Sequence, residues 1–169
     1  MRRIRQGTPA DLPVLEAIVA RVVARMAQDG TPIWDEVYPA CMLAPDIEAG
    51  RLWVAEEDGR PVGMIALCRA DTAQNAVAFT GSADEARYLV RLAVDVPMRR
   101  RGTARRLLEH GAAVAREQGA RYLRLLVACD NAAAQRLYET VGFRRVAGVY
   151  DEPIPPDGTL AEYGMERIL

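Results

Sequence analysis

The sequence predicts one α/β domain over residues 1–169, with a mixed β-sheet of about seven strands and about four helices on its faces. The chain of 169 residues suits one core, because single domains usually span about 100–200 residues. Half of the residues are hydrophobic and 27% are charged, as in average globular proteins. Residues 88–129 have the pattern of strand, helix and strand. This βαβ unit predicts one parallel strand pair.

The N-terminal half predicts three strands and two helices. Residues 2–6 form the first strand, and residues 8–11 (Thr-Pro-Ala-Asp) begin a helix with a capping residue, Pro and a carboxylate in the favoured order. An apolar stripe follows at helical spacing: Leu12, Leu15, Val19, Val22, Val23 and Met26. A loop and a short helix around residues 46–49 come next. Residues 52–56 and 62–68 predict a hairpin, because Asp58-Gly59 supplies the positive φ that its turn needs.

The C-terminal half continues the alternation after a polar connection at residues 70–86. Residues 88–94 predict a strand, residues 102–118 a helix, and residues 122–129 a buried strand. A helix at residues 131–141 ends at Gly142, and residues 143–147 and 162–169 predict the last two strands. The helices therefore cover a sheet that contains both parallel and antiparallel pairs.

Charge and composition exclude several functions. The net charge of −1 gives no global basic field for nucleic acid, although all 22 basic residues are arginine. No stretch approaches the roughly 18–20 apolar residues of a membrane span. The basic start lacks the apolar segment of a secretory leader, so we expect a cytoplasmic protein. Cys41, Cys68, Cys129 and the lone His110 are too dispersed to predict a zinc site or disulfides, and we expect no metal.

Residues 99–104 carry the strongest local signal for a ligand. A strand runs into a turn that opens a helix, where the first backbone N–H groups lack intrahelical partners and the helix dipole favours anions. Five arginines lie between residues 99 and 106, and Gly102 allows close approach of the backbone. This turn therefore predicts an anion cradle; the alternative is an ordinary turn with a solvated basic helix start.

A second motif lies after the βαβ unit. Asn131 and Tyr138 are seven residues apart, so both lie on one face of a helix. Residues 99–104 match Arg-x-x-Gly-x-Ala, and residues 137–143 read Leu-Tyr-Glu-Thr-Val-Gly-Phe. With both motifs at these distances, the chain resembles the GNAT superfamily of acyl-CoA-dependent N-acetyltransferases. The resemblance covers nearly the whole chain.

The resemblance implies the GNAT fold, in which a bulge splays the parallel strands at residues 88–94 and 122–129. It also implies how acetyl-CoA is bound. The backbone of the first strand would bind the pantetheine arm, the turn would cover the pyrophosphate, and Asn131 would hold the end of the arm or cap its helix. The implied cofactor-binding residues are Leu92, Ala93, Val94, Arg99, Arg100, Arg101, Gly102, Thr103, Ala104 and Asn131.

Catalysis by such a protein needs an oxyanion donor and a proton for the leaving thiolate. A backbone N–H at Val94 or its neighbours would serve the oxyanion. Tyr138 would protonate the thiolate, since phenols have a pKa near ~10 and thiols near ~8.5; the alternative for Tyr138 is a core tyrosine. Family members often use a Glu near the splayed strands as the base, where this chain has Arg87 and Arg91. Composition alone offers Glu36, Asp84 and Glu85, each also interpretable as a surface charge.

The resemblance predicts transfer of an acetyl group from acetyl-CoA to the amine of a small molecule in a direct ternary complex. Trp34 and Tyr38 would form a wall of the acceptor site or anchor its loop, and polyamines, amino acids, aminoglycosides and protein N-termini all stay open as acceptors. The first alternative is a catalytically silent acyl-CoA sensor or partner-binding module. A weaker one is an acyltransferase for protein N-termini. His110 and Cys129 are interpreted as packing residues, and a homodimer is an open expectation.

Overall fold

The direction of the strand pairs identifies a mixed sheet. In the computed structural model, residues 1–154 and 158–169 are described and form eight strands and four α-helices. Strand β4 (Ala86–Val94) pairs in parallel with β5 (Tyr122–Ala128), and the pairs β1–β2, β2–β3, β5–β8, β6–β8 and β7–β8 are antiparallel. This confirms the predicted α/β class and its parallel pair.

The chain divides into two compact units. The first contains Met1–Leu67 and Arg91–Gly111, and the second contains Cys68–Val90 and Ala112–Leu169. Strand β4 and helix α3 (Thr103–Glu117) contribute residues to both units. The organisation of residues 1–169 as a single domain stays a prediction.

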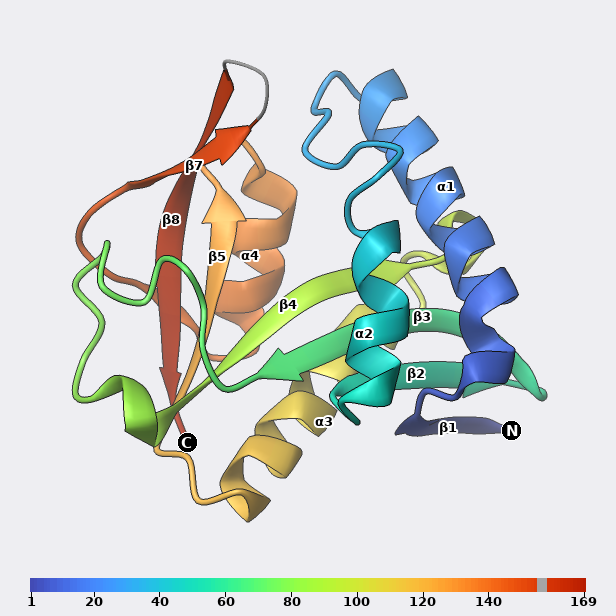
Figure 1. Ribbon diagram of the computed structural model, residues 1–169, viewed down its shortest axis with the longest axis horizontal. Helices are drawn as coiled ribbons and strands as arrows, with labels where there is room; N and C mark the ends of the chain where they lie inside the picture. Colours follow the sequence, from blue (N-terminus) through green and yellow to red (C-terminus); the bar gives the residue numbers. More distant parts are fainter. Residues whose placement is uncertain (155–157) are drawn as a thin grey trace. The chain divides into compact units, whose positions relative to one another are not determined.

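The first unit is built on three antiparallel strands and two helices (Figure 1). Its strands are β1 (Arg2–Gln6), β2 (Leu52–Glu57) and β3 (Arg60–Cys68), and its helices are α1 (Leu12–Gln28) and α2 (Leu43–Glu48). Helix α2 begins three residues earlier than expected. In the β2–β3 hairpin the turn residues Asp58 and Gly59 have φ of 49° and 81°, which confirms the predicted turn.

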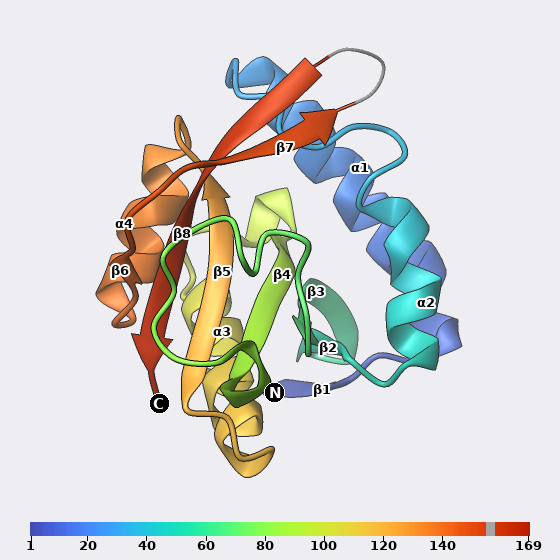
Figure 2. The same cartoon turned by 60° about the vertical axis from the view of Figure 1, so that its left-hand side comes forward.

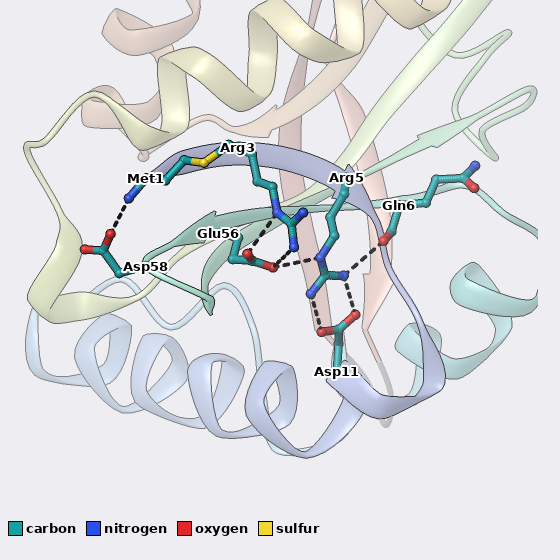
Figure 3. A network of polar contacts seen from close by, with 7 residues as sticks. All are labelled: Met1, Arg3, Arg5, Gln6, Asp11, Glu56 and Asp58. Carbon is teal, nitrogen blue, oxygen red and sulfur yellow. Dashed lines mark hydrogen bonds and ion pairs between the residues drawn. The ribbon is translucent and has the colours of Figure 1, made fainter.

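The start of α1 is fixed by a network of charges that also ties it to the sheet (Figure 3). The Arg5 guanidinium donates to both Asp11 oxygens, at 2.7 and 2.8 Å, and to Glu56 Oε2 at 2.8 Å. Asp11 in turn accepts from the Thr8 backbone N–H at 2.8 Å, as the predicted capping box requires. The network holds the pKa of Asp11 down, at about 2, chiefly through the hydrogen bonds from Arg5.

The second unit contains the first part of β4, strands β5 to β8 and α4 (Ala132–Thr140), with β5 beside β8 (Figure 2). Strand β8 (Gly158–Ile168) is longer than the predicted strand at residues 162–169, and β6 (Arg144–Arg145) is shorter than the one at residues 143–147. Strand β7 (Tyr150–Ile154) was not predicted. Its Pro and charged residues resemble a loop, and only pairing with β8 makes it a strand.

A buried arginine holds the second unit together. Arg124 on β5 is 1% exposed, and its Nε donates to Glu166 Oε2 at 2.8 Å. Its other nitrogens donate to the Tyr88 hydroxyl at 3.0 Å and to the Thr80 carbonyl. The register places Tyr88, Arg124 and Glu166 opposite one another on β4, β5 and β8. The expected polar connection at residues 70–86 is therefore bound to the sheet through this charge.

Candidate functional site

Strand β4 departs from regular geometry at Arg91, immediately before the predicted pantetheine-binding residues. Arg91 has φ of 55°, a left-handed conformation that non-glycine residues adopt at a cost. Its guanidinium donates to Asp46 Oδ2 at 2.6 Å and Oδ1 at 2.9 Å, and it is also hydrogen-bonded to Tyr38. Strand β4 is thus locally irregular at Arg91, whose side chain is held by Asp46 of α2. The bulge that the family resemblance implies for this strand stays a prediction.

The residues after Arg91 alternate in the direction of their backbone groups. Asp95 N–H donates to Val62 O at 2.9 Å, so Asp95 faces β3. A Cβ built on Gly63 of β3 would lie 2.8 Å from the Ala93 carbonyl oxygen, so this carbonyl also points toward β3. The close approach requires glycine at position 63. Because neighbouring strand residues point to opposite edges, Leu92 and Val94 have their N–H and C=O groups on the other edge.

The turn at residues 99–104, predicted to be an anion cradle, is open and exposed. Arg100 and Gly102 have φ of 62° and 78°, and no atom lies within 4 Å of a Cβ built on Gly102. Arg106 N–H donates to Gly102 O, so the amides that precede Arg106 at the start of α3 lack intrahelical acceptors. Arg99, Arg100 and Arg101 are exposed, and Thr103 is 5% exposed. Binding of a pyrophosphate at this turn, which the motif implies, stays a prediction.

Asn131 and Tyr138 lie in the second unit, at the two ends of α4. Asn131 is the N-cap of this helix, and its Oδ1 accepts from Ala134 N–H at 3.2 Å, which confirms the capping role. Tyr138 is half-buried, with its ring 6.0 Å from that of Phe143 in an edge-on arrangement. Burial, and then the charge of Glu162, raise the pKa of Tyr138 to about 12. Its hydroxyl is therefore protonated at neutral pH.

Sequence reasoning missed Glu162. This half-buried residue pairs with Ala128 of β5 on one side and Tyr150 of β7 on the other. Burial raises its pKa to about 7, with smaller contributions from the charges of Glu152 and Asp71. A carboxylate at the start of a predicted strand has no sequence pattern that would mark it as a site residue. Its burial depends on β7, which was not predicted.

The proposed acceptor segment lies in the first unit. The rings of Trp34 and Tyr38 pack edge to face with centroids 6.4 Å apart. Asp35 Oδ1 accepts from the N–H groups of Val37 and Tyr38, each at 2.7 Å, so Asp35 shapes this loop. Of the carboxylates considered as bases, Glu85 is paired with Arg121 at 2.8 Å, and Glu36 and Asp84 are exposed.

The remaining candidate residues have structural surroundings. The His110 ring packs on Trp53 with centroids 4.5 Å apart, in line with a packing role. Cys41, Cys68 and Cys129, all within the described residues, form no disulfide. Across residues 1–154 and 158–169, no group of three His, Cys, Asp or Glu side chains could hold a metal ion. In the same residues, no helix has the length and hydrophobicity to span a bilayer.

Comparison with protein families decides the classification, because the model of the acetyltransferase (GNAT) family matches residues 23–143, more than half of the chain. The chain belongs to the GNAT acetyltransferase family. The region that matches the family model includes the turn at residues 99–104 and both Asn131 and Tyr138. No curated protein sequence is significantly similar to this GNAT protein.

Solved structures resemble this GNAT protein over nearly its whole length. The ribosomal-protein-alanine N-acetyltransferase from Brucella melitensis is 26% identical, with a TM-score of 0.72 and 99% of each chain covered. A GNAT acetyltransferase from Streptococcus agalactiae is 20% identical, with a TM-score of 0.82 and coverage of 99% and 95%. The yncA protein from Salmonella typhimurium, solved with its cofactor acetyl-CoA, is 22% identical, with a TM-score of 0.76 and coverage of 100% and 94%.

Proposed function

We propose that this GNAT protein transfers the acetyl group of acetyl-CoA to the amine of a small molecule, directly and without an acetylated enzyme. The observation that carries the proposal is the turn at residues 99–104, where open space at Gly102 meets unpaired helix-start amides and exposed arginines. Membership of an acetyltransferase family supports the same donor. Residues 99–104 would bind the pyrophosphate, and the outward backbone groups of Leu92 and Val94 would bind the pantetheine arm.

The chemistry required of the chain is modest. Acetyl-CoA supplies an activated acyl group as a thioester. The backbone N–H at Val94 would stabilise the carbonyl oxygen as negative charge develops on it. Tyr138 would give its proton to the departing sulfur, for which a phenol that is fully protonated at neutral pH is suited. Asn131 would add its side-chain amide to the pantetheine contacts while it caps α4.

The acceptor is proposed to lie against Trp34 and Tyr38. Their edge-to-face packing gives an apolar surface beside the Arg91–Asp46 pair, which holds Tyr38 by a hydrogen bond. A second acceptor class, the α-amine of a protein N-terminus, is favoured by the likeness to the ribosomal-protein-alanine N-acetyltransferase. Both classes present a primary amine, and the acceptor panel described next separates them.

The test combines binding with turnover. Saturating acetyl-CoA should raise the thermal midpoint, because a ligand at a hundredfold excess over its Kd adds about 2.7 kcal/mol of stability. Free thiol should then be released when small amines or short peptides are added. Absence of a midpoint shift would contradict the proposal. A shift without thiol release on any amine or peptide would favour the acyl-CoA sensor.

A further inference from the structure

Glu162 lies where two strands meet β8 in the second unit. Strand β8 pairs with β7 up to Glu162, which faces Tyr150, and with β5 from Glu162 onward, where it faces Ala128. Ala128 is the last residue of β5, the second strand of the parallel pair. In sheets of this kind ligands bind at the carboxyl ends of the parallel strands. Glu162 is thus placed at the edge of the sheet where chemistry is expected.

The surroundings of Glu162 differ from those of the other sequestered carboxylates. Four carboxylates are less than 9% exposed, and each is paired with at least one arginine: Asp11, Asp46, Glu56 and Glu166. Glu162 is half-buried, and among the residues that the structure describes none forms a hydrogen bond or ion pair with its carboxylate. A sequestered carboxylate without a cation costs stability, and such groups cluster at functional sites.

The groups that face Glu162 are acids and phenols. Glu152 and Tyr150 come from β7, Asp71 comes from the segment after β3, and Tyr138 comes from α4. Cys129 follows Ala128 in the chain, and its backbone N–H donates a hydrogen bond to the Ala161 carbonyl. Burial and the two negative charges raise the pKa of Glu162 to about 7, so at neutral pH it can both accept and return a proton.

We propose that Glu162 is the general base of the acetyl transfer, and that it works as a pair with Tyr138. This inference rests on the proposed function. As the amine nitrogen bonds to the acetyl carbon, a proton passes from nitrogen to a Glu162 oxygen. The C–S bond breaks with its electron pair on sulfur, and the Tyr138 hydroxyl gives its proton to that sulfur.

A proton transfer between Glu162 and Tyr138 then restores both side chains. Protonated Glu162 returns its proton to the Tyr138 phenolate, and the raised pKa of Tyr138 makes this direction favourable. The sum is one amine and one thioester converted to one amide and one thiol, with both side chains in their original states. The carboxylate that is missing from β4, where Arg87 and Arg91 lie, is thereby supplied by β8.

The decisive comparison is Glu162→Gln against Glu152→Gln. With the best amine, wild-type kcat should rise with pH through an inflection near 7. Glu162→Gln should lower kcat at pH 7 by about 10²–10⁴-fold and abolish the inflection, while the acetyl-CoA Kd stays unchanged. Glu152→Gln should keep the plateau kcat and move the inflection to lower pH, because it removes a charge that holds a proton on Glu162.

A second readout does not need turnover. Side-chain carboxyl ¹³C signals of the free protein should include one that titrates near pH 7, that disappears in Glu162→Gln and that titrates lower in Glu152→Gln. Absence of that signal, or undiminished kcat in Glu162→Gln with wild-type transfer intact, would overturn only the role of Glu162. Wild-type protein that transfers no acetyl group would overturn the proposed function, and the role of Glu162 with it.

Discussion

Arg91 and Asp46 form a buried, two-point ion pair, with Nε 2.6 Å from Oδ2 and the second nitrogen 2.9 Å from Oδ1. The Asp46 side chain is 0% exposed, and its Oδ1 also accepts from Arg51 Nε at 2.7 Å. One carboxylate thus serves two guanidinium groups. It fixes the one residue of β4 that has a positive φ, so the shape of that strand depends on α2.

Removal of Asp46 should destabilise the protein strongly. Asp46→Ala leaves the buried Arg91 without its partner, and breaking a buried pair in this way costs about 3–5 kcal/mol. The urea midpoint measures this loss. The matched control is Asp29→Ala, which breaks the exposed Arg25–Asp29 pair and should barely move the urea midpoint, because water screens an exposed pair. Equal losses in the two variants would show that the Asp46 pair contributes no more than a surface pair.

Gly102→Val should weaken acetyl-CoA binding by at least about tenfold, equivalent to ~1.4 kcal/mol. The added side chain would occupy the open space proposed for the pyrophosphate. Because Gly102 has φ of 78°, valine there also strains the backbone. Gly119→Val controls for that strain, since Gly119 has φ of 77° and equally open surroundings. Both variants should lose about 1–2 kcal/mol of stability, but calorimetry should show lost affinity only for Gly102→Val.

Tyr138→Phe should lower kcat by roughly ten- to a thousandfold, within or somewhat below the range of general acid catalysis because water can substitute in part. The acetyl-CoA Kd and the thermal midpoint should barely change, since the ring and its contact with Phe143 are kept. Tyr163→Phe removes a phenol hydroxyl from β8 as a control and should keep full activity. A kcat unchanged from pH 6 to 9 in Tyr138→Phe would exclude this residue as the acid.

The network at the start of α1 should make stability sensitive to acid. The pKa of Asp11 is held at about 2 in the folded protein and is about 3.9 in an unfolded chain. A depressed pKa contributes stability that is present above the unfolded value and is lost as pH falls toward the folded value. Unfolding free energy should therefore drop between about pH 4 and 2. Asp11→Asn should flatten that drop in urea titrations at several pH values, and an unchanged slope would contradict it.

Glu162 should have the opposite effect on stability. Its folded pKa of about 7 lies above the ~4.3 of an unfolded Glu, so the folded state binds more protons and loses stability as pH rises between these values. Glu162→Gln removes this penalty. The variant should be more stable than the wild type at pH 8, on the order of 1 kcal/mol, and similar at pH 4. Thermal melts at the two pH values would show it, and a variant less stable at pH 8 would refute it.

Local signals in the sequence were sufficient for most elements. The hairpin turn follows from Asp58 and Gly59, whose positive φ is a property of two adjacent residues. The capping box from Thr8 to Asp11 and the N-cap at Asn131 likewise involve residues three apart. Such contacts form within one turn of chain, so the order of residues is enough to predict them.

Contacts between distant residues could not be predicted in the same way. Arg124 lies in a segment interpreted as an apolar strand, yet it is buried because Glu166, 42 residues later, faces it across β5 and β8. Asp46 meets Arg91 across 45 residues. Glu162 acquires its raised pKa from β7 and Asp71, which only the folded sheet brings near. The motifs thus indicated the family and the cofactor turn, while the candidate base required the strand register.

The distribution of aromatic residues gives the two units different optical signatures. Both tryptophans of the chain, Trp34 and Trp53, belong to the first unit. The aromatic residues of the second unit are all tyrosine or phenylalanine. Selectively excited tryptophan emission therefore reports unfolding of the first unit only, whereas far-ultraviolet circular dichroism reports both. If the two melting curves coincide, the units unfold as one cooperative body. If emission changes first or last, the order of the two transitions can be read without any label.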